Sequence, residues 1–550
     1  MKNIFFILLL FISIISISQN NSDNSLLIPS SKPKLVVGIV VEQMRQDYLD
    51  KFWDKFSDKG FKKLVINGTN CKNAFLNYSL TQTSPGYATI ITGAEPAAHG
   101  IVTDYWFNHL TGKKEISIED NAQEIIGTKK DKSGFSPKNL LSTTFSDETK
   151  IFYANKSKVF SLSLSKYAAI LSGGFAADAA VWFDNVSGNW VTSSYYTKKL
   201  PKWIEDQNDK KMPEEYLTRI WTPTFPIQDI KKFDYDTNIY KIGIDGVYKT
   251  FPYNYSEMKK FIINYELLEM IPEGNTHLTD LAVAALYNEN LGKDDFTDFL
   301  FVNYSVSENI GRLFGPQSAE VLDLYLRLDQ NIAHLIEVIE EVVGKNNVLI
   351  YLTSNHGISE IPQFSMDNKL PTGIYKQHYI VALLKSYLKS IYGEGEWILD
   401  YNNSQLYLNK TLIEDSGIAL GAFQEKIISF IINSNGITNA ISSTQFQNMI
   451  FMSGMPQKMQ NSYNQKRSGD IMISLKPGWI EDLPFATNHN SGYSYDTHVP
   501  LIWYGWKIKK QTIYTKINIT DIAPTISNIL NTPPPPLTTG KILEEITISK

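Results

Sequence analysis

Residues Lys34–Val41 read KLVVGIVV, a nearly unbroken run of β-branched and aliphatic side chains. Such a run is typical of a parallel strand that is buried on both faces. Further apolar runs at Phe299–Val306 and Asn347–Thr353 are separated from it by stretches with helical periodicity, the longest at Gly315–Ile339. Alternation of strands with long helices predicts an α/β fold, with a doubly wound, mostly parallel central sheet flanked by helices.

The first residues have the pattern of an export signal. The chain begins MKNIFFILLLFISIISISQN, with Lys2 before an apolar run from Ile4 to Ile17. Because this run is short for a membrane span and polar residues follow it, we predict a signal peptide at residues 1–18 and a linker at 19–32. An uncleaved anchor is the alternative. The sequence predicts no later transmembrane segment, so we expect an exported protein, periplasmic or extracellular.

The composition limits the classes of partner. Cys71 is the only cysteine among 550 residues, which excludes an intrachain disulfide and a metal site built from cysteines. A net charge of −5 at pH 7 gives no reason to expect nucleic acid as a partner. With 43% hydrophobic residues the chain is able to bury a large core, and we expect one main domain over residues 33–545.

Residues 106–290 of this domain are rich in aromatic, lysine and asparagine residues and in turns. We interpret them as a cap inserted over the site, interrupted by a core strand near residues 158–171. The aromatic run Trp182–Tyr196 is interpreted as the core of the cap, with a platform for a sugar or a base as the alternative.

The segment Leu80–Ile101, LTQTSPGYATIITGAEPAAHGI, predicts a turn that opens a helix. Thr83 stands where an N-capping hydroxyl is expected, and Gly86 allows close approach to the backbone. Free N–H groups and the positive end of the helix dipole attract anions. The segment is therefore either an ordinary helix cap or a phosphate cradle that contains a hydroxyl nucleophile.

Polar residues follow several of the expected strands. Glu42 comes directly after the first strand, Asn355 and His356 follow Asn347–Thr353, and His498 precedes another apolar run. In open α/β sheets the carboxyl ends of the strands carry the chemistry, so these residues are candidates for the site.

Taken in chain order, these motifs resemble those of the alkaline phosphatase superfamily, and most closely of the secreted PafA-type alkaline phosphatases in the nucleotide pyrophosphatase/phosphodiesterase branch. The segments that carry the resemblance are VVGIVVEQMRQDYL at Val36, TSPGYATIITGAEPAAHGI at Thr83, AAILSGGFAADAAVWFD at Ala168, ENIGRLFGP at Glu308, LTSNHG at Leu352, YDTHVP at Tyr495 and TDIAPTI at Thr520. The resemblance implies an alkaline-phosphatase-like fold and a Thr83 nucleophile assisted by two zinc ions.

The resemblance also implies that the metal ligands have changed. Thr83, His356 and His498 match family positions, whereas the residues that depart from the family pattern are Glu42 and Glu308 for two Asp residues, Asn355 for a third Asp, and Arg312 for a His. Arginine has no lone pair to offer a cation. The group Glu42, Thr83, Asn355 and His356 could hold one ion. Glu308 and His498 would be the remnant of a second site that Arg312 disrupts, so the resemblance implies one Zn²⁺ ion or none.

Glu42, Glu308 and Arg312 could instead form a salt-bridge network in an emptied metal site. His356 and His498 would then be hydrogen-bonded residues without a ligand role.

The resemblance places the phosphate-binding residues of the family at three positions that have also changed. An Asn and a Lys-x-Arg pair are expected there, and this chain has Asp104, Ser165 and Tyr167. A carboxylate repels a phosphate dianion, and loss of both cations removes the charge-assisted hydrogen bonds.

Three hypotheses follow. The first is a catalytically impaired pseudo-phosphatase with a binding or scaffolding role toward an unknown protein partner. The second is an active hydrolase of phosphate or sulfate esters that uses Thr83 with altered or single-metal coordination. The third is a structural envelope protein, which predicts a filled pocket.

Overall fold

The computed structural model describes residues 31–128, 134–226, 228 and 238–547. The expected signal peptide at 1–18 and most of the expected linker lie outside the described residues. Among the helices that the structure does describe, none is both long and apolar enough to cross a bilayer.

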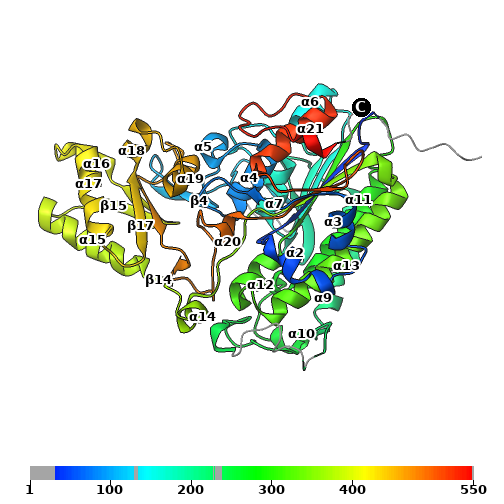
Figure 1. The fold of residues 1–550 in the computed structure, drawn as a ribbon, viewed down its shortest axis with the longest axis horizontal. Coiled ribbons are helices and arrows are strands. Elements are labelled where there is room, and N and C mark those ends of the chain that lie inside the picture. The colour runs from blue at the N-terminus through cyan, green and yellow to red at the C-terminus, as the bar shows by residue number, and fades with distance from the viewer. Residues whose placement is uncertain (1–30, 129–133, 227, 229–237, 548–550) are drawn as a thin grey trace, which may run out of the picture.

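A ten-stranded sheet forms the centre of the molecule (Figure 1). Across the sheet its strands are β21 (Gln511–Ile513), β2 (Thr69–Cys71), β20 (Leu501–Gly505), β13 (Val348–Thr353), β1 (Leu35–Val41), β12 (Asp298–Tyr304), β7 (Val159–Ser163), β8 (Ala179–Asp184), β9 (Asn189–Ser193) and β6 (Ile125–Ile126). The five strands from β13 to β8 are parallel, whereas β20 and β9 pair antiparallel on either side. The α/β prediction is confirmed, with a sheet that is mixed at its edges.

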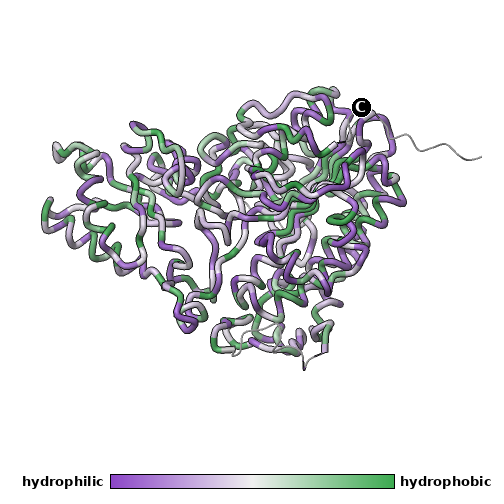
Figure 2. The backbone as a smooth tube through the Cα atoms, in the orientation of Figure 1, coloured by the Kyte–Doolittle hydropathy of each residue, from purple (hydrophilic) through white to green (hydrophobic). Residues whose placement is uncertain are grey.

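Alternate residues of β1 enter two different apolar cores. Val37 and Ile39 belong to one core and Val36 and Val40 to the other, because successive side chains of a strand point to opposite faces. The helices that cover the first face include α11 (Glu273–Asn288) and α13 (Ala319–Val342), and those on the second include α4 (Thr83–Thr92), α7 (Lys166–Gly173) and α21 (Ile522–Leu530). Figure 2 shows the hydrophobic residues concentrated along the central strands between these helices.

The prediction of a strand over residues 158–171 is wrong for the second half of this range. β7 ends at Ser163, and Lys166 begins α7, with the Ser165 side chain accepting a hydrogen bond from the N–H of Ala168. Part of the region interpreted as a cap also lies in the central sheet, because β6, β8 and β9 extend it. The apolar run was read correctly as buried, but capping by a serine hydroxyl ended the strand and started a helix.

The chain segment between β13 and β20 forms a smaller unit with its own core (yellow to orange in Figure 1). This unit was not predicted from the sequence. Its sheet has the order β15 (Ile398–Asn402), β16 (Gln405–Leu408), β18 (Ile471–Leu475), β17 (Ile437–Ser442), and its helices include α15 (Gln377–Tyr392) and α17 (Leu420–Ile431). At the turn after β15, the side-chain amide of Asn402 donates to the carbonyl of Tyr105, 2.9 Å away. The β15–β16 hairpin is thereby joined to the main body.

Gly86 allows the first turn of α4 to lie against the end of β13. A Cβ at this position would lie 2.5 Å from the carbonyl oxygen of Asn355. We expect Gly86→Ala to lower the free energy of unfolding by about 2–3 kcal/mol, because the clash is with backbone. Denaturant unfolding followed by circular dichroism measures this loss.

The matched control is Gly421→Ala in α17, where the new Cβ would have an ordinary contact at 3.6 Å. Removing a helical glycine there should leave stability unchanged or raise it by up to about 1 kcal/mol. Equal effects at the two positions would contradict the close approach of α4 to Asn355.

Candidate functional site

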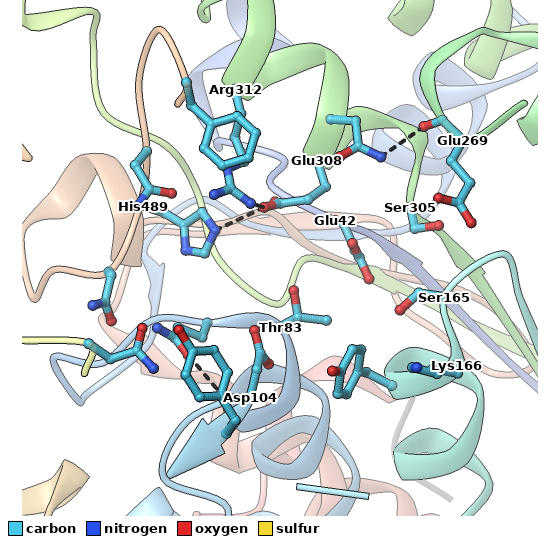
Figure 3. A pocket seen from close by; sticks show the side chains of 18 of the residues that line it. Glu42, Thr83, Asp104, Ser165, Lys166, Glu269, Ser305, Glu308, Arg312 and His489 are labelled. Carbon is cyan, nitrogen blue, oxygen red and sulfur yellow. Dashed lines mark hydrogen bonds and ion pairs between the residues drawn. The ribbon is translucent and has the colours of Figure 1, made fainter. Parts of the chain in front are cut away.

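A cavity of about 880 Å³ opens at the carboxyl ends of the central strands. Glu42 follows β1, Thr83 begins α4, and Glu308 and Arg312 lie on α12 (Val306–Phe314). Figure 3 shows these side chains facing one space together with Asp104 and His489. The cavity contradicts the filled pocket that a purely structural protein would have.

Thr83 is the first residue of α4 rather than its cap. The N-cap is Gln82, which makes no side-chain capping bond, so the prediction that the Thr83 hydroxyl caps the helix is wrong. The N–H of Ser84 instead donates to Oδ1 of Asp104 at 2.7 Å, and the N–H of Asp104 donates to Oε1 of Gln82 at 3.0 Å. A carboxylate of the protein therefore occupies the donor that an anion would use at this helix N-terminus.

Glu308 is the centre of the polar network on the other side of Thr83. Its Oε1 lies 2.9 Å from Nε2 of His489 and 3.3 Å from Nη1 of Arg312, and its Oε2 accepts from the side chain of Gln43 at 2.8 Å. Burial alone would raise the pKa of Glu308, but His489, then His356 and Arg312, hold it well below its usual value. Burial lowers the pKa of His489, and the opposing attraction of Glu308 raises it above its usual value.

Both imidazoles beside Glu308 have a fixed orientation. Nδ1 of His489 donates to the carbonyl of Thr81 at 2.6 Å, and Nδ1 of His356 donates to the carbonyl of Gly357 at 2.9 Å. Nε2 of each ring consequently faces Glu308, at 2.9 Å from Oε1 for His489 and at 3.8 Å from Oε2 for His356. The rings stack with centroids 3.9 Å apart. Backbone carbonyls position metal-binding histidines in this way.

The ligand atoms of Glu308, His356 and His489 all lie within 4.8 Å of one another. One carboxylate and two imidazole nitrogens fit a single zinc ion, which would act as a Lewis acid beside Thr83. The same residues do not fit two ions, because Arg312 adds a positive charge and Asn355 supplies a neutral amide in place of a carboxylate. The Nδ2 atom of Asn355 is buried without a hydrogen-bond partner among the described residues.

The structure does not bring His498 into this group, so its prediction as a site residue is wrong. Its Nε2 lies 2.8 Å from the carbonyl of Lys72, and its ring stacks on Phe75 at 4.4 Å. His489 takes the place that was assigned to His498. Sequence reasoning missed it because it lies in a polar loop rather than at a strand end, and the only signal was the short distance of nine residues to His498.

Glu42 lines the same cavity as Glu308 and His489. It is 2% exposed, and burial followed by repulsion from Glu308 raises its pKa well above the usual value. Its Oε1 atom is without a hydrogen-bond partner in the part of the chain that the structure describes. Three carboxyl groups, Glu42, Asp104 and Glu308, thus face the same space as Thr83 (Figure 3), and the ionised Glu308 disfavours a bound dianion there.

Ser165 and Tyr167 line the same cavity at the positions expected for the phosphate-binding cations. The Ser165 hydroxyl caps α7, and burial raises the pKa of Tyr167. Lys166 lies between them in sequence, with Nζ 4.3 Å from the ring centroid of Phe135. Glu269 was not predicted as a site residue. Its carboxylate lies beside the Ser305 side chain in the cavity (Figure 3).

Comparison with known proteins identifies the class to which this fold and site belong. Residues 36–486 match the family model for type I phosphodiesterase / nucleotide pyrophosphatase. The chain belongs to this family. Phosphoric-ester hydrolysis is the type of reaction that the family and its alkaline phosphatase members support.

Within this family, the chain is similar to alkaline phosphatases over nearly its whole length. It is 34% identical to alkaline phosphatase PafA of Elizabethkingia meningoseptica over 521 residues, 94% of each chain. It is 32% identical to alkaline phosphatase PhoV of Synechococcus elongatus over 520 residues, 94% of this chain and 93% of that one. The crystal structure of wild-type PafA superimposes with a TM-score of 0.90 at 33% identity, covering 96% of this chain and 100% of that chain.

Glu269 should make stability depend on pH. Burial raises its pKa to about 7, from 4.5 when unperturbed. Between these values the unfolded chain loses the proton and the folded chain keeps it, so stability falls as pH rises from 4.5 to 7, by roughly 3 kcal/mol. We expect Glu269→Gln to make the decrease between pH 5 and pH 8 smaller when unfolding free energies are compared, and Asp298 and Asp496, whose pKa values burial raises to about 6 and about 7, to account for the part that remains.

The exposed Glu257→Gln controls for the loss of one negative charge. An unchanged pH profile in Glu269→Gln would show that Glu269 does not retain its proton in the folded protein.

Proposed function

We propose that this chain is an exported member of its family that has lost two-metal hydrolysis of phosphate monoesters and keeps the pocket for binding. The observation that carries the proposal is that protein side chains occupy both halves of the reaction site. Arg312 pairs with Glu308, and Asp104 accepts a hydrogen bond from the backbone N–H of Ser84, the residue after Thr83. A binding or scaffolding role for an unknown partner follows.

Arg312 is built into the structure at its position. Its guanidinium lies 3.6 Å from the ring centroid of Phe485, and its backbone carbonyl accepts from the N–H groups of Ala486 and Thr487. The loop that carries His489 is thus tied to α12 through the residue that replaces a family ligand. A cation placed beside Glu308 would be repelled by the guanidinium.

Asp104 opposes a phosphoryl group from the other side. Burial raises the pKa of its carboxyl, and the hydrogen bond with Ser84 opposes that rise. Displacing it from the Ser84 N–H would leave a buried acid unpaired, and an incoming phosphate would meet its charge. The loss of cations at Ser165 and Tyr167 acts in the same direction.

A second candidate function is a hydrolase with one metal ion and Thr83 as nucleophile. The group formed by Glu308, His356 and His489 favours it, because these residues fit one zinc ion. Its substrates would be phosphate or sulfate esters, including diesters.

Metal content and turnover separate the two candidates. Mass spectrometry of the purified protein gives the number of ions, and p-nitrophenyl phosphate, its diester and its sulfate report hydrolysis. We expect less than one zinc per chain and less than a twofold difference in turnover between the wild type and Thr83→Ala. One ion per chain with Thr83-dependent turnover would establish the one-metal hydrolase instead, and two ions would overturn both candidates.

Restoring the expected family residues tests the reason for the loss. A variant with Asp104→Asn, Glu308→Asp, Arg312→His and Asn355→Asp should bind zinc at least tenfold more tightly than the wild type, measured by titration calorimetry, because it regains two ligands and loses one cation.

Arg219→His adds an imidazole on the surface, outside the pocket, and serves as the control. If the restored variant gained no more zinc affinity than this control, the substituted ligands would not be what excludes the second ion.

A further inference from the structure

We propose that the cavity binds a neutral, polyhydroxylated ligand with the chemistry of a carbohydrate. The inference rests on the proposed function, because it assigns a ligand to a pocket that no longer serves phosphate monoesters. The cavity of about 880 Å³ lies within the range of small-molecule sites and is far larger than a phosphoryl group requires.

The charged side chains around the cavity are mixed in sign. The described lining residues include six carboxylic acids and three cationic side chains, with two histidines besides. The acids are Glu42, Asp104, Asp184, Glu269, Glu308 and Glu481, and the cations are Lys114, Lys166 and Arg312. Burial raises the pKa of Glu42, Asp104, Glu269 and Glu481 and so favours their protonated forms. The lining therefore offers no clear excess of cations for an anion and no clear excess of ionised acids for an amine. A neutral ligand needs neither.

The remaining polar groups supply both donors and acceptors. Eight amide side chains line the cavity in the described chain, among them Asn185, Asn309, Asn403, Asn488 and Asn490. An amide presents a carbonyl oxygen and an NH₂ group, and a hydroxyl is able to donate to the first and accept from the second. An ammonium ion only donates. A lining of mixed donors and acceptors therefore matches hydroxyl groups better than an amine.

Several of these groups have no partner within the protein. Nδ2 of Asn403 and the Oδ1 atoms of Asn488 and Asn490 are buried without a hydrogen-bond partner in the part of the chain that is described, and so is Oε1 of Glu42. Unpaired buried polar atoms are unfavourable and call for a partner. Each of these atoms is closed off from water, so the accessible remainder of each side chain is what lines the cavity, with Asn403 coming from the smaller unit and Glu42 from the residue after β1.

Asn403 is held rigidly at the cavity. It lies in the turn between β15 and β16 with a φ of 50°, followed by Ser404 with a φ of 56°. The turn is fixed because Asn402 donates to Tyr105 and the backbone N–H of Ser404 donates to Glu481 at 3.1 Å. A preorganised donor loses little entropy when a ligand binds.

Aromatic side chains complete the lining. Tyr105, 36% exposed, lies at the edge of the cavity, and Trp182 packs edge-on against Phe135 at 6.1 Å between ring centroids. Sugar rings combine hydroxyl edges with apolar C–H faces, and aromatic rings offer the matching apolar area. The aromatic run that the sequence suggested as cap core thus contributes Trp182 to the wall of the site.

The test is binding of a panel of neutral mono- and disaccharides, with maltose, cellobiose and chitobiose included, together with a neutral glycan array. Saturation-transfer NMR on the full chain detects binding and titration calorimetry measures it. We expect at least one neutral glycan to bind and Asn403→Gly to weaken it at least fivefold, since glycine keeps the left-handed backbone and removes the amide.

Asn531→Gly is the matched control, because Asn531 also has a φ of 50° but lies after α21, outside the cavity. Its affinity should equal that of the wild type. The inference is overturned if no neutral glycan binds, if Asn403→Gly and Asn531→Gly behave alike, or if spermidine or glucose 6-phosphate binds the cavity in preference to every neutral glycan.

The experiments distinguish a failure of the ligand assignment from a failure of the proposed function. Thr83-dependent hydrolysis together with Asn403-dependent glycan binding would refute the loss of hydrolysis and leave the ligand assignment in place. Absence of both Thr83-dependent hydrolysis and glycan binding would support the loss of hydrolysis and refute the ligand assignment.

Discussion

The site depends on one buried carboxylate, Glu308. It accepts hydrogen bonds or ion pairs from α12 itself, from the residue after Glu42, and from the loop that carries His489. In a medium of low dielectric constant, such a charge is stable only while its partners are in place. Arg312 and the raised pKa of His489 supply that balance from within the protein. Because Arg312 and His489 already balance the negative charge of Glu308, binding of a further cation there is unfavourable.

The fold and the site were predictable to different degrees. β1, β12 and β13 were found because strands buried on both faces have continuous apolar sequences. The change from β7 to α7 was missed because it depends on capping by Ser165 within one apolar run. The smaller unit after β13 was missed because its strands are short, helices separate most of them, and they carry no motif.

For the site, Glu42 and His356 were identified from the ends of strands, whereas Asp104, Glu308 and Arg312 were identified only through the family resemblance. Glu42 and His356 follow strands, so the position of the strand gave their position. His489 and Glu269 reach the cavity through tertiary packing, which leaves no periodic pattern in the sequence. His498 was selected because it precedes a strand and matches a histidine of the family pattern, yet that strand, β20, runs antiparallel to its neighbour β13. His498 packs on Phe75 instead of entering the group around Glu308.

The departures from the family pattern act together rather than singly. Positions 165 and 167 carry Ser and Tyr instead of cationic side chains, and position 312 carries a cation that pairs with Glu308. The carboxylate of Asp104 accepts the hydrogen bond from the backbone N–H of Ser84 at the start of α4. Each change alone would leave an unbalanced charge in the cavity, whereas the set gives a lining of mixed acids, cations and amides. A pocket of this composition recognises hydrogen-bonding shape more than net charge, which is the physical link between the proposed loss of phosphate chemistry and the proposed neutral ligand.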